Sequence, residues 1–237
     1  MKTSPPAAPL RVALLIPALN EEQALPEVLD DAPRHLFACI LVVDNGSTDQ
    51  TAAVARQHGA EVVSEPRRGY GRACLAGLVA LPADIDAVVF MDADASAVPA
   101  EAARLLEPFA RGEADLVIGA RVPELAEPGS LFWQQRWGNR LATALIGMLF
   151  GFRYTDLGPF RAIRMDALRR LEMQDTNFGW TAEMQVKALK CGLRVREVPV
   201  SCRARIGRSK ISGTLRGTLG AGTTILWTIA RLRWTTR

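Results

Sequence analysis

In the stretch DAVVFMDADAS, residues 86–96, an apolar run leads directly into two carboxylates one residue apart, Asp92 and Asp94. A near-continuous apolar run of this kind predicts a strand that is covered on both faces, as the strands of parallel sheets are. Ligands of such sheets bind beyond the carboxyl ends of the strands. We therefore expect a buried parallel sheet whose carboxyl edge carries an acidic pair.

The first half of the chain alternates strand-like and helix-like segments, as successive βαβ units do. The strand-like runs cover residues 12–17, 39–44, 60–64, 86–92 and 115–119. Segments with helical spacing, polar starts and Gly or Pro stops separate them. The predicted fold class is α/β, with a mostly parallel central sheet and helices on both faces.

The second half of the chain has a less regular pattern. It comprises a helix over 130–152, a short strand over 160–165, a helix over 181–192, an alternating strand over 193–205 and a last apolar helix over 214–234. The uncharged part of that last helix, residues 217–230, is too short to cross about 30 Å of hydrocarbon, which takes roughly 20 residues. We expect residues 211–237 to form an amphipathic helix at a membrane interface.

The helix predicted over 130–152 has an apolar face that suits either the protein core or the edge of a membrane. Apolar stripes at helical spacing are more often core. The basic and aromatic C-terminal helix shifts the balance toward a membrane platform. Trp133 and Trp137 would then lie at the interface, with Arg136 and Arg140 at the level of the headgroups.

Composition and charge bound the class of protein. With 237 residues, 49% of them hydrophobic and 23% charged, the chain suits a globular domain with one sizeable core. The net charge of +4 is uneven: no acidic residue follows Glu197, which predicts an anionic partner at the C-terminal end, whether membrane, phosphate or nucleic acid. Four cysteines without CxxC spacing and two histidines indicate neither a zinc site nor a disulfide framework.

The N-terminal residues 1–10 contain prolines before any apolar stretch can form. We expect a disordered tail there and no targeting segment, which favours a cytoplasmic protein.

Polar motifs follow each of the first four predicted strands. They read PALNEE (17–22), VVDNGSTD (42–49), RRGYGRA (67–73) and MDADAS (91–96). Taken singly, Asn20 and Asp44 are turn formers and Ser96 a helix cap. Turn chemistry does not explain why four successive strand ends offer carboxylates, amides or cations to one crevice. An acidic pair there suits Mg²⁺ or Mn²⁺, which take oxygen ligands and share them with phosphates.

In this order and at these spacings, the four motifs resemble the nucleotide-sugar-binding half of family 2 glycosyltransferases with the A-type fold. TDLGPFRAIR (155–164), FGWTAEMQVKA (178–188) and RARIGRSKISGT (203–214) resemble the branch of dolichyl- and polyprenyl-phosphate mannosyl and glucosyl synthases. The resemblance implies a catalytic domain over residues 11–210. Its nucleotide-sugar-binding half would be 11–120 and its acceptor half 121–210.

The resemblance also implies roles for individual residues. Those that match the nucleotide-sugar pocket are Pro17, Asn20, Glu21, Asp44, Arg72 and Asp92. Asp92 and Asp94 match the metal-binding pair. Those that match catalytic positions are Asp94, Asp156, Arg161, Glu183, Arg208 and Lys210, and those that match the acceptor-phosphate loop are Arg205, Arg208, Ser209 and Lys210. Gly158 and Pro159 stand where Ser-Gly is common in the family, so the resemblance does not imply which sugar is used.

The implied activity is inverting transfer of one hexose from a nucleotide diphosphate sugar, of the GDP-mannose or UDP-glucose type, to polyprenyl or dolichyl phosphate. The implied cofactor is Mg²⁺ or Mn²⁺, and the implied location is the cytoplasmic face of a membrane. A separate membrane protein or further copies of the chain are possible partners. Nucleic acid is not expected, because the aromatic residues of the tail belong to an apolar helix face rather than a stacking platform.

Two alternatives stay open. The first keeps the donor and changes the acceptor to a hydroxyl of a glycan, lipid or metabolite, with Glu183 as general base. The second is a nucleotide-binding module without catalysis, which would be expected to lose a carboxylate or the basic loop. Neither is lost in this sequence.

Overall fold

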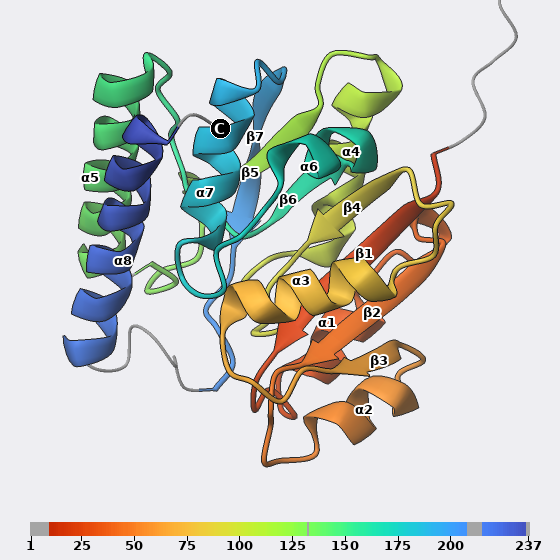
Figure 1. Ribbon diagram of the computed structural model, residues 1–237. Coiled ribbons are helices and arrows are strands. Elements are labelled where there is room, and N and C mark those ends of the chain that lie inside the picture. Colours follow the sequence, from red (N-terminus) through yellow and green to blue (C-terminus); the bar gives the residue numbers. More distant parts are fainter. Residues whose placement is uncertain (1–9, 132, 208–214, 236–237) are drawn as a thin grey trace, which may run out of the picture.

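In the computed structural model, which describes residues 10–131, 133–207 and 215–235, a seven-stranded sheet runs through the molecule in the order β3-β2-β1-β4-β6-β5-β7 (Figure 1). The strands are β1 (Val12–Ala18), β2 (Cys39–Asp44), β3 (Glu61–Ser64), β4 (Ala87–Phe90), β5 (Leu116–Ala126), β6 (Arg161–Arg164) and β7 (Val195–Cys202). Among the described strands only β6 is reversed, since it pairs antiparallel with both β4 and β5. The predicted α/β class with a mostly parallel sheet is confirmed.

Helices cover both faces of the sheet, which is why the strands are apolar on both sides. The helices are α1 (Leu25–Asp30), α2 (Thr51–Gln57), α3 (Tyr70–Ala80), α4 (Ala102–Ala110), α5 (Trp133–Phe150), α6 (Met165–Leu171), α7 (Trp180–Lys190) and α8 (Leu215–Trp234), with 3₁₀ turns at Arg34–Leu36 and Pro99–Glu101. One core contains α3, α5, α6, α7 and α8, and the other contains α1, α2 and α4. In β1, Ala13 and Leu15 enter the first core, and Leu14 and Ile16 enter the second.

The second half departs from the sequence prediction in two places. Helix α6 follows β6 directly and was not predicted, because its seven residues are too few for a clear helical period. Strand β5 continues well past the predicted end at residue 119 and pairs with β7, with a register irregularity between Arg121 and Ala126. This extension carries Arg121 to the carboxyl edge of the sheet.

Helix α8 packs beside α5 and against α7, where Figure 1 shows the two outer helices next to each other. Thr228, Ile229 and Leu232 of α8 are buried. The ammonium of Lys190, at the end of α7, donates to the carbonyl of Leu232 (2.9 Å) and also to that of Thr235. The C-terminal end of α8 is therefore fixed to α7. None of the helices described is both long and apolar enough to cross a membrane.

The outward faces of α5 and α8 keep large apolar side chains in solvent. They are Trp133, Trp137, Leu141 and Met148 on α5, and Trp227 and Trp234 on α8. Arginines Arg136, Arg140, Arg231 and Arg233 on the same two helices are also exposed. We call this set of ten residues the tryptophan face.

Candidate functional site

A cleft of about 630 Å³ opens at the carboxyl edge of the sheet. The first half of the chain lines it with Pro17, Ala18, Leu19, Glu21, Asn45, Arg68, Gly69, Tyr70, Asp92, Ala93, Asp94 and Ser96, and the second half with Arg121, Ser130, Leu131, Gln135, Pro159, Asn177, Phe178, Cys202 and Arg205. The cleft is thus built by both halves, as the sequence motifs predict. It contains three carboxylates and three arginines within the described chain.

The acidic pair lies on the loop that follows β4. Asp94 is buried; its Oδ1 accepts from the Ser96 N–H (3.0 Å) and its Oδ2 accepts from Arg205 Nη2. Oδ1 of Asp92 is buried and has no hydrogen-bond partner among the described residues. Ala95 adopts a left-handed backbone with φ of 60°, which an L-residue rarely takes. Such a strained turn is typical of a functional loop.

The pKa of Asp92 is raised to about 7, because burial penalises its charge and Asp94 repels it. The Tyr70 hydroxyl, Arg205 and Arg121 oppose this rise. Two adjacent carboxylates with an unpartnered buried oxygen suit a hard divalent cation. No cluster of three or more His, Cys, Asp or Glu side chains joins them in the described ranges, so the remaining ligands would come from phosphate oxygens and water.

The loops after β1 and β2 are tied to each other through Asn20. Its backbone N–H donates to Ser47 Oγ (2.9 Å), and its Oδ1 accepts from the Thr48 N–H (2.8 Å). Asp44 Oδ1 accepts from the Ser47 N–H (3.1 Å) in the same turn. Of the residues predicted to form the nucleotide pocket, Pro17, Glu21 and Asp92 line the cleft, whereas Asn20 and Asp44 shape the loops that border it.

Sequence reasoning missed Asn45, which organises the glycine-rich turn. Its amide nitrogen donates to the carbonyls of Glu65 and Arg67 (both 2.9 Å), and its Oδ1 accepts from the Gly69 N–H (2.8 Å). This buried side chain also lines the cleft. The position of Asn45 inside VVDNGSTD, directly after the strand, is the feature of the sequence that could have predicted its role.

The glycine-rich turn also places Arg68, rather than Arg72, on the rim of the cleft. The Arg72 N–H donates to the Thr176 carbonyl (3.1 Å), which binds the start of α3 to the loop before α7. A Cβ on Gly71 would lie 2.0 Å from the Asp175 carbonyl oxygen, so this approach requires glycine. Arg72 therefore connects the two halves of the chain beside the cleft.

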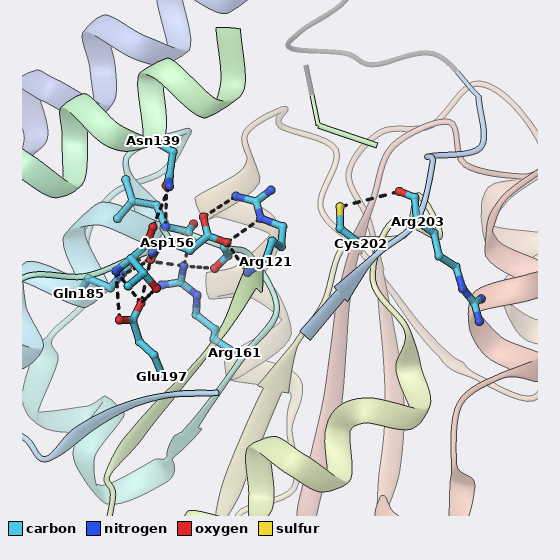
Figure 2. Close-up of polar contacts among 11 residues, drawn as sticks. Arg121, Asn139, Asp156, Arg161, Gln185, Glu197, Cys202 and Arg203 are labelled. Atoms are coloured by element: carbon cyan, nitrogen blue, oxygen red, sulfur yellow. Dashed lines mark hydrogen bonds and ion pairs between the residues drawn. The ribbon is translucent and has the colours of Figure 1, made fainter. Parts of the chain in front are cut away.

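Asp156 and Arg121 form a two-pronged ion pair beside the cleft (Figure 2). Arg121 Nε donates to Oδ2 and Nη2 to Oδ1, each at 2.7 Å, and the Arg121 N–H donates to Oδ2 at 3.0 Å. Burial lowers the pKa of Arg121, but the Asp156 carboxylate outweighs burial and raises it above its ordinary value. Arg121 lines the cleft and Asp156 lies behind it.

The segment around Asp156 is held from several elements, as Figure 2 shows for Asn139, Gln185 and Glu197. Asn139 of α5 donates to the Thr155 carbonyl (3.0 Å), Gln185 of α7 donates to the Asp156 carbonyl (3.0 Å), and Glu197 of β7 accepts from the Thr155 N–H (2.9 Å). The Asp156 backbone is therefore rigidly placed, and with it the guanidinium of Arg121.

Arg161 is buried beneath this segment and does not line the cleft. It donates to the carbonyls of Thr181 (3.0 Å), Leu157 (3.2 Å) and Gly158. Burial lowers its pKa. A Cβ on Gly158 would lie 2.7 Å from the Gly119 carbonyl oxygen, so glycine is required where this loop crosses β5.

Glu183 is fully buried and lies under the loop before α7. Its carboxylate accepts from the N–H groups of Gln174 (3.1 Å) and Asp175 (2.7 Å) and pairs with Lys187 (2.9 Å). This loop leads into Asn177, which lines the cleft, but Glu183 itself does not. Among the residues predicted for the acceptor loop, Arg205 lines the cleft, and Arg208, Ser209 and Lys210 lie outside the described residues.

Together, the mostly parallel sheet, the acidic pair at its carboxyl edge and the two-part cleft define an α/β domain of the A-type glycosyltransferase class. The chain belongs to glycosyl transferase family 2, because residues 13–172 match the family of that description.

Curated relatives and solved structures agree with this assignment. A protein of Mycobacterium tuberculosis named only as an uncharacterized glycosyltransferase is 41% identical over 213 residues, covering 88% of this chain and 93% of the relative. An undecaprenyl-phosphate mannosyltransferase of Micrococcus luteus is 33% identical over 231 residues, covering 88% and 90%. The resemblance to family 2, and to its polyprenyl-phosphate sugar synthase-like branch, is confirmed.

The fold is similar to that of glucosyl-3-phosphoglycerate synthase from Mycobacterium tuberculosis, solved with Mn²⁺, uridine diphosphate and glucosyl-3-phosphoglycerate. The TM-score is 0.77 at 23% identity, with 96% of this chain and 81% of that chain covered. At this identity the likeness concerns the fold.

Proposed function

We propose that this protein transfers a single hexose from a nucleotide diphosphate sugar to a polyprenyl phosphate, with inversion at the anomeric carbon and with Mg²⁺ or Mn²⁺ as cofactor. The observation that carries the proposal is the cleft in which Asp92 and Asp94 face Arg121 and Arg205 at the carboxyl edge of the sheet. Carboxylates for a metal and cations for phosphates are what the transfer of a sugar from a diphosphate needs.

The acidic pair would hold the divalent cation, which supplies positive charge to the departing diphosphate when it is bound. Pro17 and Glu21 border the space for the nucleoside, with Asn20, Asp44 and Asn45 fixing the surrounding loops. Arg68 on the rim and Arg121, held by Asp156, add positive charge toward the phosphates. Asp156, Arg161 and Arg72 act as positioning residues.

In the reaction, an oxygen of the acceptor phosphate attacks the anomeric carbon from the face opposite the nucleotide. The bond between that carbon and the diphosphate oxygen breaks, and its electron pair leaves with the nucleoside diphosphate. A phosphate monoester is already ionised near neutral pH, so it needs positioning cations rather than a general base. We assign that positioning to Arg208, Ser209 and Lys210 on the strength of the sequence motif.

The burial of Glu183 favours a phosphate acceptor over a hydroxyl acceptor. A general base must reach the proton that it removes. Glu183 is fully buried, paired with Lys187 and engaged with two backbone N–H groups. It suits the support of the loop that carries Asn177 better than the removal of a proton in the cleft.

A lipid acceptor is supported by two relatives and by the surface. The undecaprenyl-phosphate mannosyltransferase and a polyprenol monophosphomannose synthase of Mycolicibacterium smegmatis, 31% identical over 224 residues, carry such acceptors in their names. The tryptophan face combines exposed indoles with arginines, a combination typical of surfaces that meet headgroups. We infer attachment through α5 and α8 to the cytoplasmic face of a membrane, alone or with a membrane partner.

The test is transfer of one sugar from a panel of UDP- and GDP-sugars to polyprenyl phosphate in liposomes, with Mg²⁺ or Mn²⁺. A lipid-linked phosphosugar that EDTA abolishes is the expected result, and the panel identifies the donor. Donor binding without a lipid product, combined with transfer to a hydroxyl acceptor that Glu183→Gln abolishes, would establish the alternative. Binding without any transfer would indicate a nucleotide-binding module.

A further inference from the structure

Arg205 and Asp94 meet across the cleft although 111 residues separate them in the chain. Arg205 follows β7 and pairs through Nη2 with Oδ2 of Asp94. The Asp94 side chain is 8% exposed and that of Arg205 27%, so the pair is largely shielded from water. Within the described chain, the buried Nε of Arg205 has no hydrogen-bond partner.

The acidic pair therefore already has a cation beside it. Oδ1 of Asp94 is engaged by the Ser96 N–H, and Oδ2 is engaged by Arg205. A divalent cation that uses Asp94 has to compete with the guanidinium for this carboxylate. Within the described residues, Nε of Arg205 and Oδ1 of the neighbouring Asp92 each lack a partner, so the ion pair leaves one donor of Arg205 and one oxygen of the acidic pair unsatisfied.

The backbone keeps Arg205 close to the pair whichever partner its side chain has. The Arg203 N–H donates to the Ser96 carbonyl (2.9 Å), and the Ile206 N–H donates to the Asp94 carbonyl (3.0 Å). These two bonds fasten the segment on both sides of Arg205 to the acidic loop. The guanidinium can then change partners by side-chain rotation, without movement of the main chain.

We propose that Arg205 is an internal counter-cation that occupies Asp94 until a donor diphosphate draws it away, so that divalent cation and donor bind cooperatively. The proposal rests on the proposed function, and it gives Arg205 a donor-side role in place of the acceptor-phosphate role implied by the sequence motif. The diphosphate offers Arg205 new acceptors, including one for its Nε. Because coupling is reciprocal, the nucleotide strengthens cation binding by the factor by which the cation strengthens nucleotide binding.

The experiment measures binding of Mn²⁺ to the full chain by electron paramagnetic resonance, with and without UDP, and with GDP in a parallel series. The variant is Arg205→Gln, and Arg203→Gln is the matched control. Arg203 lies two positions away and loses the same charge, but its guanidinium pairs with Glu27 and Asp31 outside the cleft. Thermal unfolding checks that each variant is folded, and Arg205→Lys provides a second variant that keeps the charge.

For the wild type, we expect weak binding of Mn²⁺ alone and binding roughly tenfold or more tighter with the nucleotide. Arg205→Gln should bind Mn²⁺ alone about tenfold more tightly than the wild type, and the gain in Mn²⁺ affinity from nucleotide should fall to the part that direct ligation by the phosphate oxygens supplies. Arg205→Lys should lie between them, and Arg203→Gln should match the wild type.

The proposal is overturned if folded Arg205→Gln binds Mn²⁺ alone no more tightly than the wild type does. It is also overturned if nucleotide raises the Mn²⁺ affinity of this variant by the same factor as that of the wild type. Either result leaves the proposed function standing if the wild type binds Mn²⁺ with nucleotide. Failure of the wild type to bind Mn²⁺ with either nucleotide overturns both.

Discussion

Arg121 and Asp156 lie face to face in a bidentate ion pair with two N–O distances of 2.7 Å, and Arg121 alone of the two reaches the cleft. The carboxylate is anchored from behind by a backbone that α5, α7 and β7 hold. The cation that lines the cleft is thus oriented by an acidic partner that lies outside it. Such support holds the guanidinium of Arg121 in one orientation, whereas the side chain of a solvated arginine is free to rotate.

Removing the support should cost stability as well as activity. Asp156→Ala leaves the guanidinium of Arg121, whose side chain is 25% exposed, without its carboxylate, and we expect the free energy of unfolding to fall by about 3 kcal/mol. Chemical denaturation measures this change. Glu107→Ala, which breaks the exposed pair with Arg111, is the control and should change the free energy by less than about 0.5 kcal/mol. If both variants lose a similar free energy of unfolding, the Arg121–Asp156 pair stabilises the protein no more than an exposed ion pair does.

Asp94→Asn should remove turnover while the fold remains. The isosteric amide keeps an acceptor for the Ser96 N–H but loses the charge that a divalent cation needs. We expect transfer to fall by a factor of about 100 or more and Mn²⁺ binding with nucleotide to disappear. Asp166→Asn, an exposed carboxylate on α6, should retain both. Wild-type rates in folded Asp94→Asn would contradict the assigned role.

Glu183→Gln distinguishes a supporting residue from a general base. With a phosphate acceptor, we expect transfer to fall by less than about tenfold and the pH profile to keep its shape. The free energy of unfolding should fall by about 1–3 kcal/mol, because buried Lys187 loses its charged partner. Rates across pH 6–9, together with denaturation curves, give both quantities. If the folded variant shows no activity at any of these pH values, Glu183 acts as the general base instead.

The raised pKa of Asp92 predicts how stability of the metal-free protein depends on pH. Its folded pKa of about 7 lies above the ordinary value of 3.8, so between these values the folded state holds more protons than the unfolded state. Stability from this group is present below pH 3.8 and is lost as the pH rises toward 7. Asp92→Asn should therefore be more stable than the wild type at pH 8, by roughly 1–4 kcal/mol, and the advantage should shrink toward pH 4. Chemical unfolding in EDTA at several pH values measures the stability difference between Asp92→Asn and the wild type. A difference that does not change with pH would contradict the raised pKa of Asp92 as its cause.

The tryptophan face should decide attachment to membranes. Replacing Trp227 and Trp234 of α8 by serine removes two exposed indoles and should weaken binding to vesicles of mixed neutral and anionic lipid by about tenfold or more. Vesicle sedimentation measures the effect. Val79→Ser removes an equally exposed apolar side chain from α3 and should leave binding unchanged. If Val79→Ser weakens binding as much, the attachment is not specific to this face.

The sequence was sufficient to predict the sheet and the edge at which the cleft opens, because apolar runs and the motifs after them are local signals. Asp92 and Asp94 could be placed from the strand that precedes them. Which side chains turn into the cleft could not be predicted, since that depends on contacts between distant segments. Glu183 points into the core because the N–H groups of Gln174 and Asp175 and the ammonium of Lys187 converge on it.

The same limit applies to the partners of the acidic pair and of the glycine-rich turn. Asn45 finds its three backbone partners 20 to 24 residues away, in a turn whose path the sequence does not reveal. Arg205 reaches Asp94 through the extension of β5 and its pairing with β7, neither of which has a distinct local signal. The reversed direction of β6 was equally hidden, since a strand of four residues carries no sign of its orientation.

Lys190 of α7 holds the C-terminal end of α8 through the carbonyls of Leu232 and Thr235. It joins the outer helix to α7, and a Cβ on Gly179 would lie only 2.4 Å from Thr228 Oγ1, so the two helices also touch at the other end of α7. With α8 resting on a bilayer, the cleft would stand at a constant height above it. A lipid acceptor would then be selected by the distance at which its reacting oxygen projects from the bilayer, and lipids with longer or shorter polar headgroups would react poorly.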